Sequence, residues 1–156
     1  MPIAQRLKAF LEERGIHYEL VSHAESADSQ HSASAARVPG HQLAKAVLLE
    51  DEQGYVVAVA PACQHIHLGR VHRLLGRLIG LATEPELAKL FPDCVPGAVP
   101  PLGMVYGLPT VVDEQLFRVQ EVWFEAGDHR SLVRVSGEEF TALCAEAKTA
   151  CIVEGV

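Results

Sequence analysis

Apolar and polar positions in the first third of the chain follow two different periods. Apolar residues recur at the spacing of one helical stripe over 3–14, which predicts a helix with Gly15 just beyond its end. Residues 16–21 then alternate between apolar and polar, as a short strand does. The Ser-, Ala- and His-rich segment 24–34 predicts a loop, and a short alanine-rich helix is expected around Ala35.

The middle of the chain has the pattern of a β-hairpin followed by a helix. Two β-rich runs, 43–49 and 55–60, are joined by acidic residues and Gly54, which predicts the hairpin. Residues 68–75 predict a helix that Gly76 ends.

Capping signals mark the start of two further helices. Thr83 is followed three residues later by Glu86, and Ser136 by Glu139, and both pairs have the capping-box pattern. Further short strands are expected at 78–81, 110–112, 121–125, 132–135 and 150–153. We therefore predict a mixed α+β fold of about seven short strands and five helices around one core.

Length and composition fit this interpretation and narrow the partners. The 156 residues are 49% hydrophobic, which excludes a disordered chain and favours one compact domain over 1–156. No apolar run is long enough for a membrane span and the N-terminus lacks a signal-peptide pattern, so we expect a cytoplasmic protein without a membrane partner. The net charge of −7 argues against a protein that wraps DNA or other duplex nucleic acid, but not against one that grips a nucleic-acid end.

The segment 96–103, rich in proline and glycine, is the first candidate for chemistry. Glycine lets the backbone approach a ligand closely, and proline fixes the loop. The backbone N–H groups of Gly97, Ala98 and Val99 would then face a carbonyl oxygen or a phosphate. The alternative is a structural proline-rich crossover.

Two further candidates are a lysine and a turn. Lys45 lies in the apolar run 43–49, so its side chain either snorkels from a sheet edge or is held inward for a function. The turn Gly127-Asp128-His129 places a histidine beside an aspartate, where it can orient a group, accept a proton or cap the turn.

Basic and metal-binding side chains give weaker signals. Arg70, Arg73 and Arg77 form a basic stripe that is either a solvated helix face or a contact with nucleic acid. Cys63, His65 and His67 would share one strand face, but no second ligand set accompanies them, so we expect no metal and no other cofactor.

Three blocks together resemble the YbaK/prolyl-tRNA-synthetase-associated editing-domain family. They are the lysine run 44–49, the G-x-x-x-P loop from Gly97 to Pro101 with the following Gly103, and the turn 127–129. Their order and spacing fit the family over nearly the whole chain. The Gly-Asp-His turn departs from the His-Pro dipeptide that prolyl-type editing domains often have there.

The resemblance implies a mixed, mostly antiparallel sheet closed into a partial barrel with flanking helices. It also implies a deacylase that acts in trans on the ester between a wrongly attached amino acid and the 3′-terminal adenosine of tRNA, with a synthetase as a further possible partner. It assigns Lys45 to the ester or terminal nucleotide and the backbone of 97–99 to the aminoacyl group, with His129 at the late turn. The expected substrate-binding residues are Pro100, Pro101, Gly103, Gly127 and Asp128.

Two other functions stay open at this point. One is a non-catalytic module of the same fold that binds a tRNA end, a nucleotide or a synthetase, which the acidic charge and the absence of an obvious nucleophile motivate. The other is a metal-dependent hydrolase that uses His65 and His67. Ester hydrolysis without a nucleophilic triad is nevertheless chemically reasonable, because an aminoacyl ester is already activated and needs mainly positioning and carbonyl polarisation.

Overall fold

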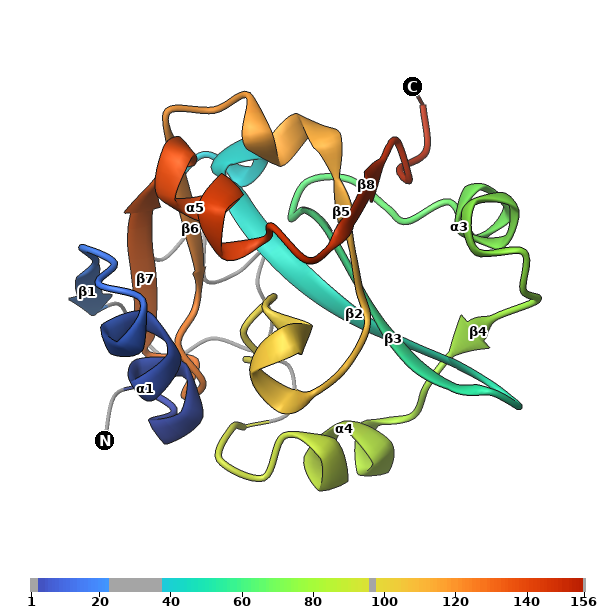
Figure 1. The fold of residues 1–156 in the computed structure, drawn as a ribbon, viewed down its shortest axis with the longest axis horizontal. Helices are drawn as coiled ribbons and strands as arrows, with labels where there is room; N and C mark the ends of the chain where they lie inside the picture. The colour runs from blue at the N-terminus through green and yellow to red at the C-terminus, as the bar shows by residue number, and fades with distance from the viewer. Residues whose placement is uncertain (1–2, 23–37, 96–97, 156) are drawn as a thin grey trace.

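One mixed β-sheet organises the chain. The computed structural model describes residues 3–22, 38–95 and 98–155. The strands follow the order β1-β7-β6-β2-β3-β5-β8, and β4 pairs with β2 beside this path (Figure 1). Their bounds are β1 Glu19–Ser22, β2 Leu43–Asp51, β3 Gly54–Pro61, β4 Gly80–Leu81, β5 Thr110–Asp113, β6 Glu121–Glu125, β7 Ser131–Ser136 and β8 Lys148–Ala150.

The sheet combines both strand directions and stays open. The β1–β7, β6–β7, β2–β3 and β2–β4 pairs are antiparallel, whereas β2–β6, β3–β5 and β5–β8 are parallel. Within the described residues β1 and β8 end the path and do not pair with each other. The mixed α+β prediction is confirmed, but closure into a partial barrel is not, because the hydrogen-bonded path does not return to its start.

Helices flank the sheet where the sequence patterns predict them. They are α1 Gln5–Glu13, α3 Leu68–Leu75, α4 Glu84–Leu90 and α5 Gly137–Leu143, with 3₁₀ helices at Gly40–Gln42, Gly103–Tyr106 and Glu114–Phe117. Both predicted capping boxes are present, and Gly76 ends α3 in the left-handed conformation. The predicted loop 24–34 and the helix around Ala35 lie outside the described residues.

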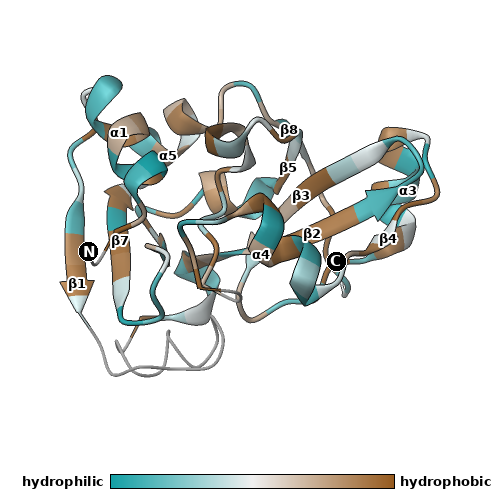
Figure 2. Cartoon of the chain, turned by 90° about the horizontal axis from the view of Figure 1, so that it is seen from below, coloured by the Kyte–Doolittle hydropathy of each residue, from teal (hydrophilic) through white to brown (hydrophobic). Residues whose placement is uncertain are grey.

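The main core lies on one face of the sheet. Side chains from alternate positions of β2, β3, β6 and β7 pack there with apolar residues of α1 and α5. Figure 2 shows hydrophobic residues along β2, β3 and β7. The members from the two helices include Leu7, Leu11, Phe140 and Leu143.

The opposite face holds two smaller apolar clusters. One surrounds Leu49 and includes Val47 and the α3 residue Val71. The other groups Leu43 with neighbours that include Leu132, and Trp123 packs against it. Because strand side chains alternate, Lys45 faces the same side as Leu43 and Val47, and so interrupts the apolar surface between the two clusters. We call this side of the sheet the lysine face.

None of the helices in the described ranges has the length and apolar character that crossing a membrane requires.

Candidate active site

The second and third sequence blocks meet at the turn between β6 and β7. The backbone N–H of Val95, just before the proline–glycine loop, donates a 2.7 Å hydrogen bond to the carbonyl of Gly127. The preceding carbonyl, that of Ala126, accepts from the N–H of Ala4 at 2.8 Å. The turn is thus held from two sides, and the loop leaves from a fixed point beside it.

A cluster of polar side chains fixes the start of the loop. The Tyr106 hydroxyl donates to Asp93 Oδ1 at 2.7 Å, and the backbone N–H of Arg6 donates to Oδ2 at 3.1 Å. Burial by itself would raise the pKa of Asp93, but these hydrogen bonds to the carboxylate outweigh it and lower the pKa. Asp93 therefore stays ionised and ties the loop to α1 and to the 3₁₀ helix Gly103–Tyr106.

Cys94 belongs to the same cluster. Its Sγ lies 3.3 Å from the Tyr106 hydroxyl. Burial is the main reason that the pKa of this thiol rises to about 12, so it remains protonated near neutral pH. Its role in the structure is to pack beneath Gly127, since a Cβ on that glycine would lie 3.4 Å from the sulfur.

The Gly127-Asp128-His129 turn has a specific backbone geometry. Asp128 Oδ1 accepts the N–H groups of Arg130 at 2.8 Å and Ser131 at 2.9 Å, as in an Asx turn. Gly127 has φ +121°, which favours glycine, and His129 has φ +60°. Among the described residues His129 is the one non-glycine residue with a positive φ. This local structure explains Asp128 as a turn-forming residue.

The turn directs the His129 side chain inward, towards a buried glutamate. His129 Nδ1 lies 3.8 Å from Glu125 Oε2, and the two side chains are only 6% and 1% exposed. Glu125 is the last residue of β6, and alternation from Phe124, which lies in the main core, puts Glu125 on the lysine face.

Lys45 comes from the neighbouring strand at the same height. In the parallel β2–β6 pair, Leu43 is opposite Trp123 and Ala44 is opposite Phe124. Lys45 and Glu125 are the next residues of the two strands after these pairs. Lys45 is half-buried, so it is held in the sheet and does not extend from an edge. The fold therefore brings Lys45, Glu125 and His129 to one end of the lysine face.

The proline–glycine loop is buried over its described residues, and Val99 packs into the main core. The Ala98 N–H donates to the Val95 carbonyl at 3.0 Å, so the prediction of ligand-facing N–H groups narrows to Gly97 and Val99. Gly97 lies outside the described residues. Val99, Pro100 and Pro101 are buried.

Gly103 has a packing explanation of its own. A Cβ there would lie 2.4 Å from Thr110 Oγ1 and 2.8 Å from Val57 Cγ2. Val57 belongs to the main core, so Gly103 lies on the side of the sheet away from Lys45. Its predicted part in substrate binding receives no support from this position.

Two of the three arginines, Arg70 and Arg73, lie in α3, which is on the side of the molecule away from β6 and β7 (Figure 1). Gly76 ends α3, so Arg77 is beyond the helix, where it forms an ion pair with Asp51 of β2. Arg70 is half-buried and its Nη1 donates to Cys151 Sγ at 3.2 Å, while Arg73 is exposed. The stripe is not assembled with the Lys45 cluster, and a tRNA contact there stays a prediction.

The residues considered as metal ligands are separated by the end of β3. That strand stops at Pro61, so Cys63, His65 and His67 do not share a strand face. His67 instead caps α3, accepting the Arg70 N–H at its Nδ1. In the ranges that the structure describes, no three His, Cys, Asp or Glu side chains are grouped as metal ligands.

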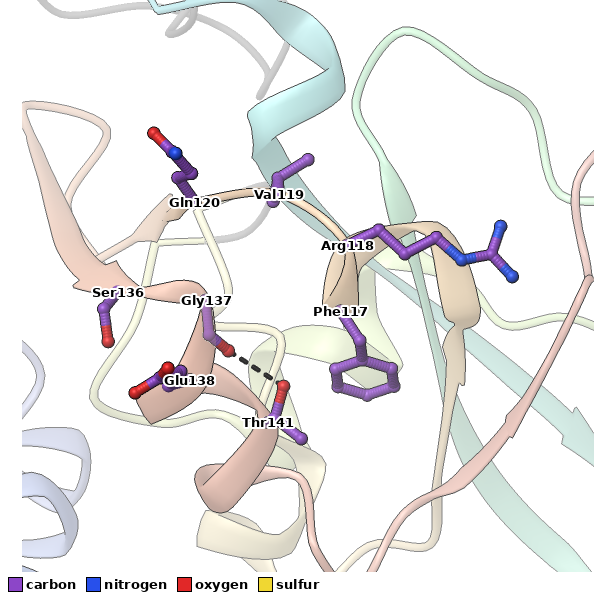
Figure 3. A pocket seen from close by; sticks show the side chains of 8 residues that line it. All are labelled: Phe117, Arg118, Val119, Gln120, Ser136, Gly137, Glu138 and Thr141. Carbon is purple, nitrogen blue, oxygen red and sulfur yellow. Dashed lines mark hydrogen bonds between the residues drawn. The ribbon is translucent and has the colours of Figure 1, made fainter.

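A separate hollow of about 390 Å³ lies near the opposite end of β6. Figure 3 shows its lining, in which Thr141 hydrogen-bonds the Gly137 carbonyl and Arg118 extends away from Ser136 and Glu138. It contains none of the residues that the three sequence blocks contribute, so we do not assign it to the reaction.

Comparison with known sequences identifies the family to which this chain belongs. The sequence model for the aminoacyl-tRNA editing domain matches residues 23–143, a span that includes all three blocks. This chain belongs to that family. The family predicted from the lysine run, the loop and the turn is therefore confirmed.

Solved structures agree with the assignment of the editing domain. A candidate trans-editing enzyme for prolyl-tRNA synthetase is 31% identical, with 99% of each chain covered and a TM-score of 0.85. A scaffold protein from work on epitope backbone grafting is 29% identical over 100% of this chain and 99% of its own, also with a TM-score of 0.85. A hypothetical protein at 21% identity shares the fold, covering 96% of this chain and 100% of its own at a TM-score of 0.85. No curated protein sequence matches this chain.

The sequence patterns did not identify Glu125, which the structure places beside His129. In the run 121–125 it alternates with Val122 and Phe124 and so resembles a solvent-facing strand residue. The available signal was its position directly before Ala126 and the turn at Gly127, where a strand end and a tight turn enclose a side chain.

Proposed function

We propose that this editing domain hydrolyses the ester bond between a wrongly attached amino acid and the 3′-terminal adenosine of a tRNA, acting in trans. The observation that carries the proposal is the hydrogen bond from the Val95 N–H to the Gly127 carbonyl, because it joins two of the family's three blocks. The β2–β6 pair, which ends one residue before Lys45 and Glu125, adds the third block to the same end of the sheet. Family membership supplies the substrate class.

The chemistry requires few protein groups. The aminoacyl ester is activated, and the vicinal ribose hydroxyl of the terminal adenosine can assist an attacking water. The remaining work is to hold the ester and to stabilise the charge that develops on its carbonyl oxygen. In this proposal the N–H groups of Gly97 and Val99 act on the carbonyl oxygen, and Lys45 contacts the ester or the terminal phosphate. His129 lies on the other side of the ester.

Recognition in this proposal is confined to the acceptor end. A net charge of −7 is unfavourable for a broad tRNA surface, whereas Lys45 supplies positive charge at the candidate site and the exposed Arg73 supplies it at the other end of the sheet. The 31% identity with a candidate trans-editing enzyme for prolyl-tRNA synthetase favours proline tRNA as the first carrier to test and a synthetase as a transient partner. Such an activity would operate in the cytoplasm, where tRNA is charged.

A deacylation panel tests the proposal. The purified chain is incubated with seryl, alanyl, cysteinyl, threonyl and prolyl esters on matched and mismatched tRNAs, and the release of amino acid is followed. We expect at least one mismatched ester to be hydrolysed well above the buffer rate and its matched counterpart to be spared. Turnover of no ester would contradict the proposal, and if filter binding then detected the tRNA, a non-catalytic binding module would be the better description.

A further inference from the structure

The hydroxyl of Tyr106 joins the two ends of the proline–glycine loop. Asp93 precedes the loop, and Tyr106 is the last residue of the 3₁₀ helix that follows it. The hydroxyl donates a 2.7 Å hydrogen bond to Asp93 Oδ1, although the two residues are 13 positions apart. The segment that contains the G-x-x-x-P loop is therefore closed at its base by one side-chain contact. We call this contact between Tyr106 and Asp93 the loop clasp.

Both partners of the loop clasp have the protonation state that a strong hydrogen bond needs. Burial is the main reason that the pKa of Tyr106 is raised well above its usual value, and the neighbouring Cys94 and Asp93 raise it further. The phenol thus keeps its hydrogen at neutral pH, and the ionised carboxylate of Asp93 accepts it. A hydrogen bond to an ionised acceptor is about twice as strong as one between neutral groups.

The N-terminal end of α1 holds the loop clasp and also holds the β6–β7 turn. The Arg6 N–H donates to Asp93 Oδ2 at 3.1 Å, and the Arg6 guanidinium lies 5.5 Å from the centre of the Tyr106 ring. Just before the helix, the Ala4 N–H donates to the Ala126 carbonyl at 2.8 Å. One end of one helix is therefore a common support for the loop and for the turn.

The residues next to the loop clasp contact the turn directly. The Val95 N–H donates to the Gly127 carbonyl at 2.7 Å, and a Cβ on Gly127 would lie 3.4 Å from the Cys94 sulfur. A loosened clasp would displace Val95 together with Asp93, since only Cys94 separates them in the chain. The loop N–H groups that are proposed to act on the ester would then move relative to His129 on the turn.

We propose that Tyr106 is a positioning residue of the editing site, which through Asp93 fixes the loop against the turn in the arrangement that the ester requires. Tyr106 belongs to none of the three family blocks. A displacement of about 1 Å in an active site can cost about 100-fold in rate, so a hydroxyl that does not touch the ester can still control its hydrolysis. This inference rests on the proposed deacylase function for its kinetic consequence, and on the contacts alone for its structural one.

A second tyrosine provides a matched control for the loss of a hydroxyl. Tyr55 lies in β3, beside the hairpin turn, and its hydroxyl donates to Glu86 Oε2 of α4 at 2.6 Å. Tyr55→Phe and Tyr106→Phe each remove a hydrogen bond to a carboxylate, and we expect both to lower the thermal unfolding midpoint by about 2–8 °C. Only Tyr106→Phe removes a contact at the base of the loop.

Amide hydrogen exchange tests the structural consequence. We expect the Val95 N–H to exchange about 10-fold faster in Tyr106→Phe than in the wild type, because its hydrogen bond to Gly127 opens more often. In Tyr55→Phe the same N–H should exchange within about twofold of the wild-type rate. Unchanged exchange in Tyr106→Phe, or an equal increase in both variants, would overturn the proposal.

The kinetic arm measures kcat and KM on the best ester from the panel. We expect Tyr106→Phe to lower kcat about 10-fold with KM changed by less than about twofold, and Tyr55→Phe to leave both within about twofold of the wild type. In an Asp93→Ala background, Tyr106→Phe should have almost no further effect, because the acceptor of its hydrogen bond is gone. Equal losses of kcat in the two phenylalanine variants, or a full additional loss in the Asp93→Ala background, would contradict the role of the loop clasp.

The two arms also distinguish failure of this inference from failure of the proposed function. If the wild type hydrolyses no ester, the deacylase proposal fails, and the exchange of the Val95 N–H still decides whether Tyr106 positions the loop. If Tyr106→Phe does not fold, Asp93→Ala removes the same hydrogen bond from the other side, and the same increase in exchange and loss of kcat are expected.

Discussion

Charged side chains lie in different surroundings at the two ends of the sheet. At the hairpin end, Arg77 pairs with Asp51 through two nitrogens, and the Asp51 carboxylate also accepts the N–H groups of Gln53 and Gly54. At the site end, Glu125 and His129 are buried more deeply, yet their nearest atoms are 3.8 Å apart. The hairpin charges complete their own turn, whereas the site charges connect the last residue of β6 with the turn that follows it.

The glycines of the two turns show the same contrast. Gly54 in the β2–β3 hairpin and Gly127 in the β6–β7 turn have φ +136° and +121°. A Cβ at Gly54 would meet open space, whereas one at Gly127 would lie 3.1 Å from Ala4 Cβ and 3.4 Å from Cys94 Sγ. The hairpin needs only the backbone freedom of glycine, but the site turn also needs its lack of a side chain. The site end is therefore the one where segments that are distant in the sequence come into close contact.

Substitution of Lys45, at the site end of the sheet, should have the largest effect on activity. We expect Lys45→Ala to lower kcat/KM for deacylation about 100-fold or more, because the variant removes the cation that is proposed to contact the ester. The measurement is hydrolysis of the best ester from the panel under single-turnover conditions.

A lysine in an edge strand provides the matched control. Lys148 lies in β8, is exposed and is paired at the far edge of the sheet with β5. Lys148→Ala removes the same charge from the same secondary structure, and we expect activity within about twofold of the wild type. Equal losses in the two variants would mean that overall charge, and not the position of Lys45, governs the reaction.

The next largest effect is expected from the two glycines. Both Gly127→Ala and Gly54→Ala should lose about 1–3 kcal/mol of unfolding free energy through backbone strain, and Gly127→Ala should lose more because of the contacts with Ala4 and Cys94. Activity should fall about 10- to 100-fold in Gly127→Ala alone, since a displaced turn moves both His129 and the loop that Val95 anchors.

Urea unfolding and deacylation rates of the two variants provide the measurement. A comparable loss of activity in Gly54→Ala would show that general destabilisation, and not the geometry of the site turn, is responsible.

The fold was largely predictable because its elements carry local signals. The helix Leu68–Leu75 with Gly76 beyond it, and the hairpin of β2 and β3, follow from periodicity and turn residues that depend on no distant contact. Closure of the sheet was not predictable in the same way, since it depends on whether the first and last strands of the path meet. The helix predicted after Ser136 is also present and runs to Leu143, before the chain turns towards β8.

The candidate site was predictable only where one residue stands out from its surroundings. Lys45 is conspicuous as a charge in an apolar strand, and the structure holds it in the sheet. Glu125 was missed because a charged residue at an alternating strand position is normally exposed; its burial depends on the turn that follows and on the neighbouring β2 strand. The engagement of the Ala98 N–H by Val95 is likewise a detail of loop geometry that composition does not encode.

The smallest effect is expected at the hairpin end, and it depends on pH. The Arg77 side chain, as the main cause, together with the N–H groups of Gln53 and Gly54, lowers the pKa of Asp51 to about 2. An aspartate in the unfolded chain has a pKa of about 3.9. Because the folded value is the lower one, Asp51 adds stability above about pH 4, and this contribution is lost as the pH falls through about 2. Asp51→Asn should therefore lower the unfolding midpoint near neutral pH, and the difference from the wild type should shrink towards about pH 2.

The measurement is the denaturation midpoint of both proteins across this pH range, with deacylation followed near neutral pH. Since Asp51 and its partners lie at the end of the sheet away from Lys45, we expect the rate to stay within about twofold of the wild type. A midpoint difference that persisted at about pH 2 would show that the aspartate stabilises the hairpin without its charge. A large loss of activity near neutral pH would instead mean that the two ends are coupled through β2, the strand that contains both Lys45 and Asp51.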